Sequence, residues 1–226
     1  MKFLVNASIG HAEPCWTNPL RMASALAAGL AFLASCTPKE TQVLMQSSEA
    51  LGAVLAEETV RVAGAKKRVA IISAANWGPT STAEGAFTAA LKKQGFLPFT
   101  VKSADLGDPM RRGQVGLKSA DFFEALQNAA DAGAVVSFAG APLLGPGDAA
   151  RLSSGHPPVL VVATATLGKV RGVWANPEQL GRLLDARIIE LAIIDGSPES
   201  AAPSPGKADA THQTFAQNYR ILRSPH

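Results

Sequence analysis

The stretch RVAIISAANWGPTSTAEGAFTAALKKQG, residues 68–95, decides the fold class of this chain. It opens with a nearly continuous apolar run at 69–73, which is typical of a strand buried on both faces of a parallel sheet. A helical pattern follows, with Ser81 and Glu84 at the spacing of a capping box and Gly95 at its end. A strand that leads directly into a helix is the repeating unit of α/β proteins.

Strand and helix patterns continue to alternate on both sides of this stretch. Further strands are predicted at 96–101, 134–138, 159–163 and 172–175, and further helices at 47–63, 119–133 and 176–196. Ser119 and Asn176 are the expected caps of the last two helices. Right-handed crossovers place successive strands in one parallel sheet. We therefore predict an α/β fold, a three-layer, doubly wound, mainly parallel sheet of about five strands with a late edge strand.

Composition narrows the class of protein. The chain has 226 residues, of which 47% are hydrophobic and 17% charged, so it can bury a core and is not a disordered polymer. Its net charge of +3 is too small to argue for nucleic-acid binding. The two Cys residues exclude a disulfide scaffold, and the four His residues are scattered without metal-ligand spacing, so no metal is expected.

An uncharged run of seventeen residues separates Arg21 from Lys39 and contains Leu33-Ala34-Ser35-Cys36. A membrane-spanning helix needs about 20 apolar residues, so this shorter run suits the apolar region of a secretory signal. Its motif resembles the lipobox of bacterial lipoproteins. The resemblance implies that the chain is cut before Cys36, and that Cys36 then carries the lipids that anchor the protein in a membrane. The alternative is a buried apolar helix with an incidental Cys36.

The lipobox resemblance also implies a location. It predicts a lipid-anchored protein of the bacterial cell envelope that faces the periplasm. Thr37 stands where an Asp would retain such a protein at the inner membrane, and it therefore favours the outer membrane. The sequence does not decide at which Met translation starts. A start at Met1 keeps the positive charges of Lys2 and Arg21 ahead of the apolar run, whereas a start at Met22 removes both.

Five parts make up the predicted domain organisation. They are a signal peptide at 1–35, a lipidated tether at 36–46, the α/β domain at 47–196, a linker rich in Pro, Ser and Ala at 197–214, and an edge strand or tail at 215–226.

The domain at 47–196 resembles one lobe of the type 1 periplasmic binding proteins, the fold of sugar-binding and repressor-ligand domains. The resemblance rests on residues 68–73, on the helix at 82–95, and on 121–138, where a helix ending in Ala-Asp-Ala-Gly leads into a strand. The sugar clamp of that family needs two lobes, and this chain has the length of one. The resemblance therefore implies a single lobe.

Several catalytic motifs are absent from the sequence. It contains no Gly-x-Gly-x-x-Gly after the first strand, no P-loop and no Gly-x-Ser-x-Gly nucleophile elbow. No catalytic residue and no cofactor are therefore predicted.

Ligand-binding candidates lie where predicted strands end, because doubly wound sheets bind ligands beyond the carboxyl ends of their strands. The first strand supplies hydroxyl, amide and indole groups ahead of a helix amino terminus, which favour anions or sugar-like ligands. The full set of candidates is Ser73, Asn76, Trp77, Thr80, Ser81, Gly140, Thr164, Arg111 and Arg112. The two arginines fit a carboxylate or phosphate clamp. The structural alternative is a turn, a helix cap and solvated arginines.

These features favour a non-enzymatic envelope lipoprotein that binds a small molecule, with a sugar-like ligand as one candidate, or that docks another protein. Two alternatives stay open. One is an enzyme, a hydrolase or transferase, that uses the same edge of the sheet. The other is a structural docking domain that forms a homodimer. The expected partners are the membrane through Cys36, a small molecule, and a second copy or an envelope protein, and no nucleic acid is expected.

Overall fold

A computed structural model describes residues 39–75, 78–106, 116–152, 155–164, 176–196 and 209–225. The chain divides into two units, 1–42 and 43–226, and the fold below is that of the second unit. Its helices are α2 (Lys39–Ala63, which begins in the first unit), α3 (Gly78–Lys93), α4 (Ser119–Asn128), the 3-10 helix η1 (Asp148–Arg151), α5 (Pro177–Asp185) and α6 (Ala210–Asn218). Its strands are β1 (Arg68–Ala74), β2 (Leu97–Ala104), β3 (Leu117–Lys118), β4 (Ala134–Ser137), β5 (Pro142–Leu143), β6 (Val159–Ala163), β7 (Leu191–Asp195) and β8 (Tyr219–Arg223).

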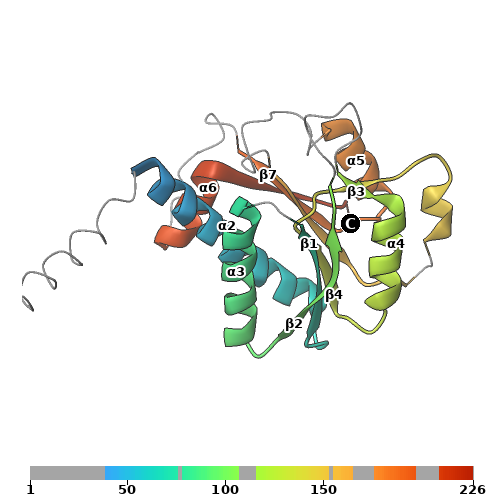
Figure 1. Cartoon of the computed structure of the whole chain (residues 1–226), viewed down its shortest axis with the longest axis horizontal. Coiled ribbons are helices and arrows are strands. Elements are labelled where there is room, and N and C mark those ends of the chain that lie inside the picture. Colours follow the sequence, from blue (N-terminus) through green and yellow to red (C-terminus); the bar gives the residue numbers. More distant parts are fainter. Residues whose placement is uncertain are drawn as a thin grey trace, which may run out of the picture. The chain divides into compact units, whose positions relative to one another are not determined.

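Six strands form the central sheet in the order β2-β1-β4-β6-β7-β8. Its first five strands are parallel, and β8 pairs with β7 in antiparallel orientation. Helices lie on both sides of the sheet (Figure 1). The predicted α/β class, the three layers, the mainly parallel sheet and the late edge strand are therefore confirmed. A second sheet of two strands, β3 and β5, was not predicted.

Two separate cores fill the space between the sheet and its helices. Along β1, Ala70 and Ile72 belong to the core under α4 and α5, whereas Val69 and Ile71 belong to the core under α2, α3 and α6. All four side chains are buried. Successive strand residues point to opposite faces, so a strand with a helix layer on each side needs apolar residues at every position. This requirement explains the continuous apolar run in the sequence.

One crossover differs from the others. Helix α3 connects β1 to β2, α4 lies between β2 and β4, and α5 connects β6 to β7. The described part of the connection from β4 to β6 has no α-helix, and carries only β5 and the four-residue η1. Three crossovers lie on the face of the sheet that α4 and α5 cover. Among the described residues, only two of these crossovers contain an α-helix, so this helical layer is incomplete.

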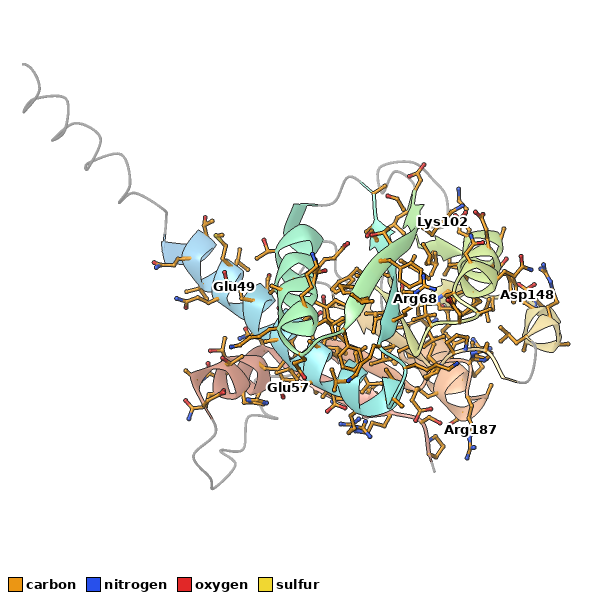
Figure 2. All side chains as sticks on the ribbon, turned by 90° about the horizontal axis from the view of Figure 1, so that it is seen from below. Glu49, Glu57, Arg68, Lys102, Asp148 and Arg187 are labelled. Atoms are coloured by element: carbon orange, nitrogen blue, oxygen red, sulfur yellow. The ribbon has the colours of Figure 1, made fainter. Side chains whose placement is uncertain are left out.

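Both edges of the sheet carry irregular features. At one edge, Pro98 of β2 lies opposite Val69, and the register with β1 shifts where Ile72 aligns with Lys102. Lys102 forms ion pairs with two acids of α4, Asp121 at 3.0 Å and Glu124 at 2.7 Å (Figure 2). A proline is tolerated in a strand at the edge of a sheet, because no neighbour needs its missing N–H. The other edge is the antiparallel strand β8.

Helix starts differ from the predictions in three places. Helix α2 begins at Lys39, ahead of the expected start at Ser47, so residues of the predicted tether are helical. Helix α3 begins at Gly78, so Ser81 is inside it, and Glu84 accepts a hydrogen bond from Ser73 Oγ at 2.5 Å. The predicted capping box is therefore wrong. Ser119 is the first residue of α4 and not its cap, which is Lys118.

The predicted helix at 176–196 is also wrong, because it is a helix followed by a strand. Arg187 has a φ of 53°, in the left-handed region, and the chain leaves α5 there to enter β7. The apolar spacing continues past this point, so the sequence gives no sign of the break. The predicted strand at 172–175 lies outside the described residues, and β7 is the fifth parallel strand instead.

The C-terminal boundaries shift as well. Residues 210–214 of the predicted linker and 215–218 of the predicted strand form α6. Asp209 caps this helix, because its Oδ1 accepts a hydrogen bond from His212 N at 2.9 Å. The edge strand begins only at Tyr219.

A close contact holds α2 against α3 at Gly52. A Cβ atom on Gly52 would overlap Ala83 O, and would lie 2.8 Å from Phe87 N and 2.9 Å from Ala86 Cβ. The backbone of α3 therefore occupies the space that a side chain at position 52 would need.

Replacing Gly52→Ala is expected to destabilise the fold by about 1–3 kcal/mol, since the two helices must move apart. The free energy of unfolding in urea measures the effect. Gly85→Ala is the matched control, because Gly85 is on α3 with no atom within 4 Å of a Cβ there. This control is expected to be neutral or to gain up to about 1 kcal/mol from helix propensity. Equal stabilities of the two variants would contradict the packing argument.

Helix α6 is joined to α2 by His212. Its Nε2 lies 3.0 Å from Glu57 Oε2 and its Nδ1 lies 3.0 Å from Asp209 Oδ1 (Figure 2). These hydrogen bonds, first to Asp209 and then to Glu57, raise the pKa of His212 above its usual value, although desolvation opposes them. Arg223 of β8 adds a bidentate contact to the neighbouring Glu58, with both bonds at 2.8 Å.

The raised pKa of His212 makes folding stability depend on pH. The charged imidazole contributes fully below about pH 6, and its contribution is lost as the pH rises through the raised pKa. The free energy of unfolding of the native protein, relative to His212→Gln, is expected to fall between about pH 6 and pH 8 by less than about 1 kcal/mol, because the pair is solvent-exposed. Parallel pH profiles of the two proteins would contradict this interpretation.

Candidate functional site

The carboxyl edge of the sheet is where the strand order reverses. Strand β2 lies on one side of β1, and β4 lies on the other. Connections at the opposite edge are short: 64–67, 94–96, 129–133 and 186–190. Connections at the carboxyl edge include segments with more residues, 105–116, 164–176 and 196–209, and most of these residues lie outside the described part of the chain. A reversal of strand order at the carboxyl edge is typical of ligand sites in doubly wound sheets.

Three predicted ligand-binding residues lie at this edge in the structure. Ser73 is the second-last residue of β1, Gly140 follows β4 and Thr164 follows β6. Ser73 is half-buried and donates to Glu84, while Thr164 is only 3% exposed. Gly140 has a φ of 82°, and its carbonyl oxygen accepts a hydrogen bond from Ser137 Oγ at 2.8 Å. The hydroxyl of Ser73 and the turn at Gly140 thus take part in hydrogen bonds within the protein.

The other predicted residues are not described to the same extent. Asn76, Trp77, Arg111, Arg112 and the lipidation candidate Cys36 lie outside the described residues. The backbones of Thr80 and Ser81 belong to the start of α3. Their part in binding therefore stays a prediction.

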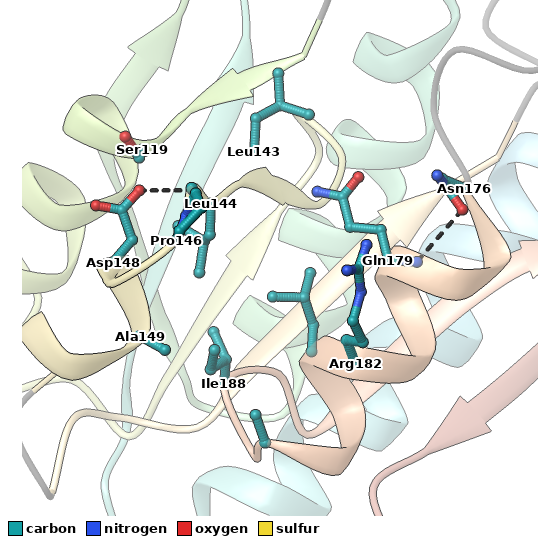
Figure 3. A pocket seen from close by; sticks show the side chains of 13 residues that line it. Ser119, Leu143, Leu144, Pro146, Asp148, Ala149, Asn176, Gln179, Arg182 and Ile188 are labelled. Carbon is teal, nitrogen blue, oxygen red and sulfur yellow. Dashed lines mark hydrogen bonds between the residues drawn. The ribbon is translucent and has the colours of Figure 1, made fainter.

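A groove of about 930 Å³ begins at the same edge and follows α5 (Figure 3). One wall is the segment 143–149, which includes the start of η1, and the other is α5 with the turn that follows it. The groove occupies the layer in which the connection from β4 to β6 carries no α-helix among its described residues. We attribute the groove to the lack of a helix over this part of the sheet. Its apolar side chains include Leu143, Leu144, Pro146, Leu183 and Ile188.

Asp148 is the acid of the groove, and its carboxylate is already held by the protein. Its Oδ2 accepts a hydrogen bond from Gly145 N at 2.8 Å, and its Oδ1 lies 3.3 Å from Arg151 Nη1. The Gly145 amide, followed by Arg151, holds the pKa of Asp148 below its usual value. The group therefore stays negatively charged at neutral pH and fixes the loop at 145–148.

Two further polar side chains position α5. Asn176 Oδ1 accepts hydrogen bonds from Glu178 N at 3.0 Å and Gln179 N at 3.4 Å, which confirms it as the cap. Gln179 Nε2 donates to Pro142 O at 2.9 Å and so joins α5 to β5 across the groove. The bond from Gln179 to Pro142 therefore links the two walls, whereas the Asn176 bonds fix only the start of α5.

Arg182 lies one turn further along α5 and also lines the groove (Figure 3). Among the described residues, no carboxylate lies within 4.0 Å of its guanidinium. Glu178 is one turn before Arg182 in the helix and forms no ion pair with it in this structure. Arg182 is therefore an exposed cation at a groove of mixed polar and apolar lining, without a charged partner in the described part of the chain.

The described residues offer no assembled metal site. Within them, no group of three His, Cys, Asp or Glu side chains could hold a metal ion. Ser73 at the end of its strand, and Asp148 and Gln179 at the groove, make hydrogen bonds within the protein. In the same part of the chain, no helix has both the length and the apolar character needed to cross a membrane.

Sequence reasoning missed the groove and its residues. Leu143, Asp148, Gln179 and Arg182 carry no motif, and Asp148 is in a Pro- and Gly-rich segment that predicts only a loop. The available signal was the lack of a helical pattern between the strands at 134–138 and 159–163. A missing crossover helix leaves part of the sheet thinly covered.

Comparisons with known proteins give no assignment. No model of a protein family matches the chain. No curated protein sequence matches it either.

The hydrogen bond from Gln179 to Pro142 can be tested with Gln179→Glu. The carboxylate has nearly the same shape but cannot donate to the carbonyl, so the segment 142–148 is expected to open more often. Hydrogen exchange of its protected backbone amides, including Leu144 and Asp148, should become about 2- to 10-fold faster. Gln127→Glu is the control, since Gln127 is an exposed residue of α4 that does not line the groove. Unchanged exchange in Gln179→Glu would show that this bond does not hold the wall.

Proposed function

We propose that this chain is a lipid-anchored protein of the bacterial envelope whose α/β domain binds a small molecule without transforming it. The groove beside α5 carries the binding part of the proposal. Its volume of about 930 Å³ is within the range of ligand pockets, which run from about 300 to 1,000 Å³ and combine apolar walls with few polar groups. The proposal moves the expected site from the ends of the strands to the groove that begins there.

Three observations support binding without catalysis. The carboxylate of Asp148 and the amide nitrogen of Gln179 are held by structural hydrogen bonds, so neither is available as a reacting group. The described groove residues include no His, Cys or Lys that could act as a nucleophile or general base. The sequence also lacks the hydrolase and nucleotide-binding motifs. The likeness to one lobe of the periplasmic binding proteins stays part of the proposal.

The anchor is supported by the sequence around Cys36. The motif Leu33-Ala34-Ser35-Cys36 lies near the end of an uncharged run, and Lys39, the first residue of α2, comes three positions after Cys36. A lipid on Cys36 would therefore keep the domain at the membrane surface. We place the protein at the periplasmic side of the envelope, with Thr37 favouring the outer membrane.

One mass measurement on the detergent-purified protein tests both parts of the proposal. A co-purified ligand is expected as excess mass under non-denaturing conditions that is lost on unfolding. The lipid is expected as a covalent excess that persists after unfolding and disappears in Cys36→Ser. Cys15→Ser is the matched control and should keep the covalent excess, because Cys15 lies in the removed segment.

The two outcomes are independent. A native protein that carries no covalent lipid at Cys36 contradicts the anchor, whatever it binds. A protein without a non-covalent excess, and without binding to any of the probes described below, contradicts the binding function, whether or not it is lipidated.

A further inference from the structure

The charges of the groove restrict what it can bind. Arg182 supplies a positive charge on the α5 wall, and no described carboxylate pairs with it. A guanidinium can form two parallel, charge-assisted hydrogen bonds with one carboxylate. Arg182 is exposed and has no carboxylate partner among the described residues, so it favours a ligand with an anionic group at the α5 end.

The opposite wall excludes a second anionic group. Asp148 keeps its negative charge there, since Gly145 N, the Ser119 hydroxyl and Arg151 all stabilise the carboxylate. A ligand with carboxylates at both ends would bring one of them toward Asp148. Like charges that approach each other repel, which lowers the affinity of the groove for such a ligand.

The part of the groove between these charges is apolar. Leu143 and Pro146 line one wall, and Leu183 and Ile188 line the other. Leu183 and Ile188 are almost fully buried and belong to the core under α5, so they form a firm floor with little exposed area. The apolar surface that a ligand can cover comes mainly from the partly exposed Leu143 and Leu144 and the exposed Pro146, and an apolar ligand body gains free energy by covering it.

We propose that the groove binds a small apolar molecule that carries a single carboxylate, with the carboxylate on Arg182. This assignment rests on the binding function proposed above and names the class of its ligand. Arg182 is the residue that selects the charged group, and Asp148 is the residue that rejects a dianion.

A second hollow shows why the cation of the groove is distinctive. It has a volume of about 450 Å³ and also contains an arginine, Arg151. That guanidinium lies 3.3 Å from Asp148 Oδ1 and 4.3 Å from the ring centre of Phe123. Its charge is already paired and its planar face is already stacked, so it leaves little capacity for a ligand.

Three probes with the same six-carbon chain separate charge from shape: hexanoate, hexanamide and adipate. Each is titrated into the whole purified protein, and the methyl NMR signals of Leu143, Leu183 and Ile188 report binding in the groove itself. Hexanoate is expected to bind at least about tenfold more tightly than hexanamide, because the charged hydrogen bond to Arg182 is lost in the amide. Adipate is expected to bind more weakly than hexanoate, because its second carboxylate meets Asp148.

Variants then connect the affinity to Arg182. Arg182→Gln is expected to weaken hexanoate about tenfold and to leave hexanamide unchanged. Arg220→Gln is the control, since Arg220 is an exposed arginine of β8 that does not line the groove. Ala149→Trp adds bulk at an exposed position of the groove wall, and it is expected to weaken all three probes.

Equal affinities for hexanoate and hexanamide, or undiminished hexanoate binding in Arg182→Gln, would overturn the ligand class. If a co-purified molecule is present and stays bound in Arg182→Gln, the binding function stands and only the assignment to Arg182 fails. If no probe shifts the groove methyl signals and no molecule co-purifies, both fail. Tighter binding of adipate than of hexanoate would contradict the proposal that Asp148 excludes ligands with a second carboxylate.

Discussion

The structure depends on one constraint, which is that the central strands must be covered on both faces. Successive residues of β1, β4 and β6 point into two different cores, and nearly all of them are buried. Each exposed apolar side chain would lose the stabilisation that burial provides, so each face requires its own helix layer. On one face α2, α3 and α6 supply that layer, and α2 and α3 approach so closely at Gly52 that only hydrogen fits. On the other face the layer is thinner between α4 and α5, and the groove lies there.

The C-terminal segment, which follows the last parallel strand in the chain, adds a helix to the layer formed by α2 and α3 and a strand to the edge of the sheet. Strand β8 pairs with β7, and α6 buries Phe215 in the core that it shares with α2 and α3. Its polar contacts are made to two consecutive acids of α2, with His212 on Glu57 and Arg223 on Glu58. Residues more than 150 positions apart in the chain are thereby joined. The final segment is an integral part of the domain: the sequence predicted its edge strand but assigned the residues of α6 to a linker and to the start of that strand.

Sequence reasoning recovered what local patterns encode. Strands β1, β4 and β6 are continuous apolar runs, and Asn176-Pro177 is a strong helix start, so these elements were predicted close to their observed positions.

The helix break at Arg187 was not predictable, because a non-glycine residue with positive φ leaves no pattern and the apolar spacing continues past it. The capping box failed because Glu84 hydrogen-bonds to Ser73 of the neighbouring strand instead. The groove escaped prediction because it results from the lack of an α-helix among the described residues between β4 and β6, and a role for Gln179 and Arg182 can be recognised only beside that groove. The lipid anchor and the ligand candidates at Asn76, Trp77, Arg111 and Arg112 stay predictions.

The edge strand β2 has a consequence for copies of the protein held at high density. An open sheet edge invites a strand from a neighbouring molecule, and crowding on a two-dimensional surface would raise the frequency of such encounters. Pro98 removes one N–H donor from this edge, and the irregular register near Ile72 bends the strand. These two features make intermolecular strand pairing unfavourable along β2. They would let the protein accumulate side by side without polymerising through its sheet.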